Sequence, residues 1–223
     1  MINIEDNFKF NIGDTIVIGC SSGPDSMALV DMLLKVREKY QLQLIIAHVN
    51  HNVRSESYNE AIYMKEYCEQ NNLVFETMTI EEYGDDNFHN EARTIRYNFF
   101  ESLINKYDAS YLMTAHHGDD LIETILMRMV RGSNLNGYSG FKEIVEMENY
   151  KIVRPLIRYT KEELEKYDKD NNNHIQQIMD VKNKILLPVI NHFIFIGMSV
   201  TQTKSPTVQN KLQRSAFTYG ISF

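Results

Sequence analysis

Residues 21–26, SSGPDS, carry small or polar side chains of the kind that hold the phosphates of a nucleotide. Small residues let backbone N–H groups approach an anion closely, and serine hydroxyls add further donors. The carboxylate of Asp25 stands where it can cap a following helix or hold a phosphate-bound Mg²⁺. An ordinary turn between a strand and a helix can have this composition too, and the segment lacks the lysine of the common phosphate loop. The nucleotide-binding candidates here are Ser21, Ser22, Gly23, Pro24, Asp25 and Ser26.

A second group of reactive side chains lies in AHHGDDLIET, residues 115–124. Its members are two histidines and three carboxylates, namely His116, His117, Asp119, Asp120 and Glu123. Asp120 and Glu123 are three residues apart and would share one face of a helix. Acidic residues at a helix start can serve only as caps, but this group exceeds what capping needs. Asp119, together with Asp25 of the first segment, could bind Mg²⁺. The carboxylates of this group could instead receive the ammonium group of an amine substrate.

Two other segments carry side chains that could contact a ligand. AHVNHNVR, residues 47–54, contains His48 and His51, which suit either a metal site or a hydrogen-bonded turn. Arg93 and Arg96 would lie one turn apart on a helix, where two guanidinium groups could grip phosphate or could simply form an exposed face.

These residues fall at the ends of alternating strands and helices. Apolar patterns predict strands at residues 15–18, 42–49, 74–80 and 110–115, and helices at 25–39, 56–71, 88–106 and 119–131. A hairpin over 144–153 and a helix capped by Thr160 and Glu163 follow. The pattern indicates an α/β protein with a doubly wound, mostly parallel sheet covered on both faces. Ligands bind such sheets beyond the carboxyl ends of the strands, so the loops at 21–25, 48–54 and 116–120 should converge.

Composition points to a globular protein of the cytoplasm. The chain has 223 residues, of which 43% are hydrophobic and 24% charged, and no apolar stretch is long enough for a membrane span. No secretory signal is visible, and two distant cysteines fit a reducing compartment without a metal-binding pair. The net charge is −7, but it is unevenly spread, because residues 128–161 hold seven basic and three acidic residues. That basic segment could meet a polyanion or could be solvated surface.

Five motifs in order resemble one enzyme family. They are GCSSGPDSMAL, AHVNHNVR, EARTIRYNFF, TAHHGDDLIETILMRMVRGS and IVRPLIRYTKEEL, and together they resemble the N-terminal domain of bacterial tRNA(Ile)-lysidine synthases. The first is similar to SGGxDS, the pyrophosphate-holding motif of N-type ATP pyrophosphatases, with Ser22 in place of a glycine. We expect the hydroxyl or the backbone of Ser22 to face the phosphates.

The resemblance implies a two-step ligation on tRNA. ATP would adenylate the C2 oxygen of the wobble cytidine in the anticodon loop of tRNA(Ile), and the amine of free L-lysine would then displace AMP. The motif loop would hold pyrophosphate, Ala47, His48 and Val49 would flank adenine, and Arg93 and Arg96 would steady phosphate or RNA. The expected catalytic residues are Asp25, Asp119, Asp120 and Glu123, and those near lysine or tRNA are His116, His117, Asp120, Glu123, Arg128 and Arg131.

The family motifs end near Tyr167, which predicts a pyrophosphatase domain at residues 1–167 and a divergent extension at 168–223. The sequence is compatible with an active short form and with an inactive, truncated form that only binds a nucleotide or tRNA. It is also compatible with a homodimer. A tRNA thiolation enzyme of the same fold would need catalytic cysteines in a CxxC pair, which are absent. A metal-dependent phosphodiesterase built on His116, His117, Asp119 and Asp120 would not need SSGPDS.

Overall fold

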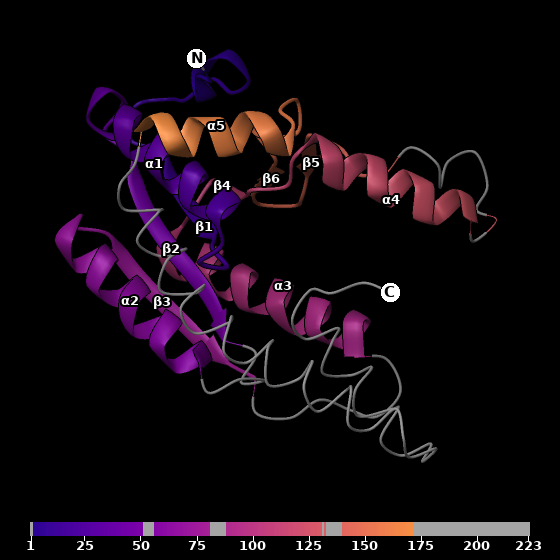
Figure 1. The fold of residues 1–223 in the computed structure, drawn as a ribbon. Coiled ribbons are helices and arrows are strands. Elements are labelled where there is room, and N and C mark those ends of the chain that lie inside the picture. The colour runs from indigo at the N-terminus through magenta and orange to yellow at the C-terminus, as the bar shows by residue number, and fades with distance from the viewer. Residues whose placement is uncertain (1, 51–55, 81–87, 131, 133–139, 172–223) are drawn as a thin grey trace, which may run out of the picture. The chain divides into compact units, whose positions relative to one another are not determined.

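The computed structural model describes residues 2–50, 56–80, 88–130, 132 and 140–171 (Figure 1). The chain divides into two compact units, Met1–Gln176 and Gln177–Phe223, and every described residue lies in the first. The predicted boundary at residue 167 stays a prediction. Helix α5, however, runs on to Asn171.

A six-stranded sheet forms the centre of the described part, with the strand order β3-β2-β1-β4-β6-β5. All neighbouring pairs are parallel except β5 with β6, which form the predicted antiparallel hairpin. The strands are β1 (Thr15–Gly19), β2 (Gln43–Asn50), β3 (Val74–Thr79), β4 (Tyr111–Thr114), β5 (Ile144–Glu146) and β6 (Lys151–Val153). The predicted mostly parallel α/β sheet is confirmed.

Helices connect these strands near the predicted positions. They are α1 (Pro24–Tyr40), α2 (Glu56–Gln70), α3 (Phe88–Tyr107), α4 (Gly118–Val130) and α5 (Lys161–Asn171), with a short 3-10 helix η1 (Ile4–Asp6) near the N-terminus. The predicted cap of α5 is present, because the backbone N–H of Thr160 donates to Glu163 and that of Glu163 donates to the Thr160 hydroxyl.

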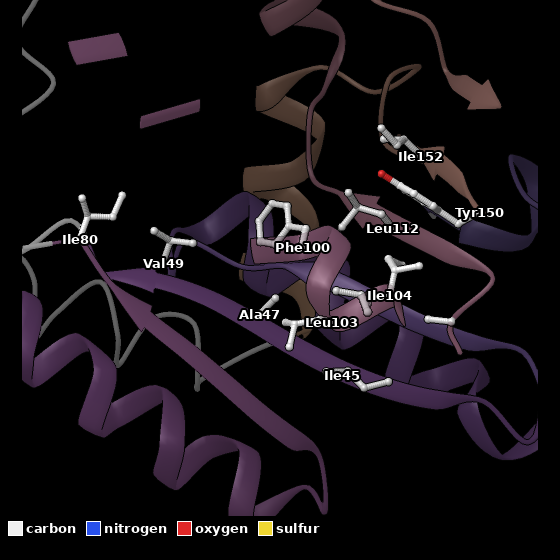
Figure 2. Close-up of a cluster of buried hydrophobic side chains, with 12 residues drawn as sticks. Ile45, Ala47, Val49, Ile80, Phe100, Leu103, Ile104, Leu112, Tyr150 and Ile152 are labelled. Atoms are coloured by element: carbon white, nitrogen blue, oxygen red, sulfur yellow. The ribbon is translucent and has the colours of Figure 1, made fainter. Parts of the chain in front are cut away.

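One face of the sheet packs against α3. Figure 2 shows Phe100, Leu103 and Ile104 of α3 beside Ile45 and Ala47 of β2, all buried in one apolar cluster. Strand residues of the opposite parity, such as Ile16, Ile18, Leu44 and Ile46, are also buried, and alternation along a strand turns them to the other face. A right-handed crossover places α1 on that face, so the sheet is covered on both sides.

The strand order reverses beside β1. The chain passes from β1 through α1 to β2 on one side, and returns through α3 to β4 on the other side of β1. Gly19 ends β1 against α3, where an added Cβ would lie 2.9 Å from Cζ of Phe100. Only glycine lets the helix pack this closely. The carboxyl ends of β1 and β4 therefore flank the switch point at which such sheets bind ligands.

Helix α4 differs from the others because none of its residues is buried (Figure 1). Its apolar side chains are solvent-exposed; Ile122 is 56% and Val130 is 88% accessible. In the part of the chain that the structure describes, no helix has the length and apolarity needed to cross a membrane.

Candidate functional site

The loop between β1 and α1 presents a helix N-terminus to the carboxyl edge of the sheet. Gly23 precedes the helix in extended conformation and Pro24 occupies its first turn. Backbone N–H groups in the first turn of a helix have no carbonyl four residues earlier, so they are free to bind an anion. The hydroxyl of Ser26 donates to the Gly23 carbonyl at 2.8 Å and lies 3.4 Å from the Ser21 hydroxyl, which fixes the two serines inside the loop.

Ser22 adopts a backbone conformation that favours glycine. Its φ is 58°, in the left-handed region, and its side chain is buried. The hydroxyl donates to the Ser21 carbonyl at 2.5 Å and lies 3.4 Å from a Glu60 carboxylate oxygen. The loop thus bends as a glycine would bend it. Because the hydroxyl is engaged within the protein, the backbone of Ser22 is the part left to meet a phosphate, and that contact stays a prediction.

Asp25 lies beside two residues of the loop after β4. The buried His117 places its Nε2 3.8 Å from Oδ2 of Asp25 and 3.6 Å from Oδ2 of Asp120. The backbone N–H of His117 also donates to Asp120 at 2.9 Å. The loops after β1 and β4 therefore converge as predicted.

Electrostatics at this point favour a cationic or hydrogen-bonding ligand. Burial raises the pKa of the Asp25 carboxyl above its ordinary value, while nearby His117 and Lys161 oppose that rise and Asp120 adds to it. Among the described residues, His117 Nδ1 is buried without a hydrogen-bond partner. A buried polar nitrogen of this kind costs free energy unless a ligand or water pairs with it. The site can hold an anion at the helix and a polar group between the two carboxylates.

Asp119 and Glu123 occupy a different side of α4. The carboxylate of Asp119 accepts a hydrogen bond from the backbone N–H of Lys161 at 2.6 Å, at the start of α5. It therefore joins α4 to α5. Asp119 and Glu123 also line an open groove along α4 with Ile122, Leu126, Met127 and Val130. The structure thus brings together Asp25, His117 and Asp120, while Asp119 is held at α5.

The residues predicted to flank adenine end β2 next to this loop. Ala47 and His48 are almost fully buried, and the Ala47 carbonyl accepts a hydrogen bond from the Cys20 N–H at 2.9 Å. Nδ1 of His48 lies 3.0 Å from the Cys20 carbonyl oxygen. Within the described ranges, no group of three or more histidine, cysteine or acidic side chains could hold a metal ion. His48 is therefore part of the hydrogen-bonded junction between β1 and β2.

Guanidinium groups gather around His116 on the other side of the switch point. Arg93 and Arg96 of α3 lie with their Cζ atoms 5.1 and 5.8 Å from the ring centre of Tyr97. Burial, and then the charge of Arg154, lower the pKa of His116 to about 4; Asp120 opposes this shift, and Arg96 and Arg93 add smaller lowering effects. His116 is therefore neutral at physiological pH.

Arg154, which directly follows β6, was not among the predicted site residues. Its side chain is only 5% exposed, Nη1 donates to the Lys142 carbonyl at 2.7 Å, and Cζ lies 5.1 Å from the Phe141 ring centre. The sequence showed Arg154 only as one member of a basic segment. Its position at the carboxyl end of the second strand of the predicted hairpin is the signal by which Arg154 could have been identified.

Comparison with known families decides what kind of domain this is. Residues 3–185 match the model of the PP-loop domain, a match that continues beyond the motif-bearing stretch ending at Tyr167. The chain belongs to the PP-loop family.

Curated relatives of this PP-loop protein carry one name. The tRNA(Ile)-lysidine synthase of Enterococcus faecalis is 46% identical over 151 residues, covering 67% of this chain and 33% of the relative. Those of Bacillus cereus and Streptococcus mutans are 38% and 32% identical and cover 90% and 95% of this chain, but 43% and 48% of their own lengths. The PP-loop chain thus spans less than half the length of these relatives.

A solved structure supports the fold. The U34-tRNA thiolase NcsA of Methanococcus maripaludis, solved with its [4Fe-4S] cluster, superposes with a TM-score of 0.62 at 13% identity, covering 82% of this chain and 70% of that chain. This likeness confirms the PP-loop architecture alone.

Three predicted residues of the PP-loop protein, His51, Arg54 and Arg131, lie outside the described residues. Arg128 is described, and its Nη1 donates to the Gly140 carbonyl at 2.7 Å. That bond joins α4 to the segment that leads into the β5–β6 hairpin. The predicted contact of Arg128 with tRNA stays a prediction.

Proposed function

We propose that this PP-loop protein ligates lysine to C2 of the wobble cytidine, position 34, of tRNA(Ile) with a CAU anticodon, consuming ATP and giving lysidine, AMP and pyrophosphate. The observation that carries the proposal is the meeting of Asp25, His117 and Asp120 beside the phosphate-binding end of α1. The names of the curated relatives supply the substrate class. Because the chain spans under half of those relatives, the activity of this chain is the point to be tested.

In the first step, the cytidine C2 oxygen attacks the α-phosphorus of ATP and the bond to the bridging oxygen breaks, releasing pyrophosphate. The helix N-terminus of α1 and the hydroxyl of Ser21 bind the leaving group, and Ser26 holds the loop through its hydrogen bond to the Gly23 carbonyl. Backbone near Ala47 to Val49 lies beside adenine. Fixed donors aimed at the charge that develops on the leaving group lower the barrier without reorganisation. Arg93 and Arg96, on the α3 side, steady phosphate or RNA.

In the second step, the lysine amine attacks C2 of the adenylated cytidine, AMP leaves, and the amine gives up a proton. Asp120, which lies beside His117, receives the amine, with Glu123 about one helical turn further along α4 as a second carboxylate. Asp25 and Asp120 flank His117, so a carboxylate or the imidazole accepts the released proton within the same site. Positioning the amine and the adenylate together is worth more than any one proton transfer.

A bound Mg²⁺ would neutralise charge on the ATP phosphates. Mg²⁺ bound with a nucleotide keeps several waters and takes one or two protein carboxylates, so a three-residue protein cage is not required. The half-buried carboxylate of Asp25 at the mouth of the loop fits this role. Asp119 has one oxygen engaged by the Lys161 N–H, which leaves its other oxygen for a ligand.

A different N-type ATP pyrophosphatase acting on RNA, or a binding form without activity, is the alternative. Purified full chain should therefore be supplied with ATP, lysine and an anticodon stem-loop of tRNA(Ile), in the conditions of the cytoplasm where we expect it to act. Formation of lysidine, detected by mass spectrometry of the digested RNA, supports ligation. Without lysine, the proposed ligation allows at most one pyrophosphate per RNA, so continued release beyond that amount would favour another N-type reaction. Release at background with bound RNA would favour the inactive form.

A further inference from the structure

Two arginines of α3, together with Arg154 directly after β6, act on one imidazole at the carboxyl edge of the sheet. The positive charges of Arg154, Arg96 and Arg93 all oppose protonation of His116. Arg154 and His116 also lie against the same ring, that of Phe141. Nδ1 of His116 lies 2.9 Å from the Thr114 hydroxyl, and its ring centre is 5.2 Å from that of Phe141. These contacts fix the imidazole among the arginines.

The positive charge of this group has little compensation. In the described ranges, none of the three arginines forms an ion pair with a carboxylate; the nearby negative charge acting on His116 is that of Asp120. Arg154 is 5% exposed, and its Nε is buried without a hydrogen-bond partner among the described residues. Burying a charged group that has an unpaired donor costs free energy unless an anion binds to that donor. A guanidinium fork matches the oxygens of a phosphate group.

Strand order shows which substrate this anion belongs to. The adenine-flanking residues end β2, the pyrophosphate loop follows β1, His116 follows β4 and Arg154 follows β6, in that order across the sheet. In this order β6 is the second strand from β1, on the side away from β2. Adjacent strands are roughly 4.8 Å apart, so Arg154 lies about 10 Å beyond β1, on the side away from the expected adenine site. Arg93 and Arg96 also come from α3, on the opposite face from α1. A phosphate here belongs to the second substrate.

We propose that Arg93, Arg96 and Arg154, with His116 between them, form a subsite for one backbone phosphate of RNA next to the base that reacts. Arg154, seated on the Phe141 ring, is the member not foreseen from the motifs. The subsite rests on the proposed function, because the reacting base must lie near Asp25 and Asp120. It orients the RNA so that the base enters from the β4–β6 side.

The test measures binding of a fluorescein-labelled anticodon stem-loop to the full chain, without ATP or lysine, across a series of KCl concentrations. Arg96→Gln and Arg154→Gln should each weaken RNA binding about tenfold and reduce the slope of log K against log salt by about one. ATP affinity, measured separately, should not change. Lys106→Gln removes one charge from the opposite end of α3 and should leave the slope as in the wild type.

Arg154 also donates to the Lys142 carbonyl, so thermal unfolding of each variant is measured alongside. If Arg154→Gln fails to fold, Arg96→Gln decides the question. Arg96 is half-buried, so Arg93→Gln, at an exposed position of α3, takes its place if Arg96→Gln fails to fold as well. Loss of ATP affinity with unchanged RNA binding would assign the subsite to the α-phosphate of ATP and overturn the proposal. So would unchanged RNA binding in both variants, or a wild-type chain that binds no RNA. Lysidine formation is scored independently, so a failed ligation assay does not decide the subsite.

Discussion

The carboxylate of Asp25 lies 3.8 Å from the imidazole Nε2 of His117, across the point where the strand order of the sheet reverses. Asp25 begins the helix after β1, and His117 belongs to the turn after β4. The same imidazole reaches Asp120 at 3.6 Å, so it holds two carboxylates at a fixed separation. The proposed ligation needs that separation, because the reaction at phosphate occurs beside Asp25 and the attack of the amine occurs beside Asp120.

Substitution of His117 tests this relationship. His117→Ala should lower kcat/KM of lysidine formation with respect to lysine by about 100-fold, because removing a positioned acid–base group typically costs this much. His117→Gln, which retains a polar nitrogen, should recover part of the rate. Equal activity of His117→Ala and the wild type, in protein with an unchanged unfolding midpoint, would contradict the role given to the imidazole.

Ser22 offers a test of the loop conformation. Its φ of 58° is strained for a side chain, so Ser22→Gly should fold within about 1 kcal/mol of the wild type and keep ATP binding. Ser22→Val should cost about 2 kcal/mol or more and weaken ATP binding, since a β-branched residue in this region is a severe outlier. Chemical denaturation and ATP titration measure both effects. A Ser22→Val protein as stable as Ser22→Gly would show that the loop takes another conformation.

Asp168 predicts a pH dependence of stability. Burial, and then the charges of Asp25, Asp31 and Glu165, raise its pKa to about 7 from the ordinary aspartate value of 3.8. The folded state therefore binds more protons than the unfolded state between these values, and this group makes the protein less stable as pH rises from about 4 to about 7. The neutral isostere Asp168→Asn should therefore unfold at a higher temperature than the wild type at pH 8.

The gain from Asp168→Asn at pH 8 should be on the order of 2 kcal/mol and should vanish near pH 4, where the wild-type carboxyl is protonated. Asp170→Asn, an exposed change on the same helix, is the matched control and should not shift the midpoint in this way. Thermal unfolding at several pH values measures the difference. A gain that is the same at pH 4 and pH 8 would mean that ionisation of Asp168 is not its cause.

The fold and the meeting of the loops after β1 and β4 were predictable because they depend on the local sequence pattern. Alternating strands and helices require a parallel sheet, and such a sheet brings the residues after β1 and β4 together wherever their side chains point. The capping box at Thr160 and Glu163 and the turn at Glu148 and Asn149 are likewise properties of adjacent residues.

The rest depends on packing between distant elements. Arg154 enters the site because a three-residue strand, β6, pairs with β4, and nothing in the residues near Arg154 specifies that partner. Asp119 turns toward α5 only because that helix begins at Lys161 beside it. Asp168 is buried because α5 packs along α1, where Tyr167 donates to Asp31 at 2.6 Å. Sequence spacing alone shows none of these three contacts.

The central claim is that this chain uses the Asp25 and Asp120 carboxylates in a lysine- and RNA-dependent reaction of ATP. The direct measurement is pyrophosphate release by the full chain with ATP, lysine and the CAU anticodon stem-loop, each omitted in turn. We predict that release in the wild type and in Asp170→Asn requires RNA and continues beyond one pyrophosphate per RNA only when lysine is present. Under these turnover conditions the rate should fall at least about 100-fold in Asp25→Ala and Asp120→Ala. A fully active Asp25→Ala protein would contradict the account.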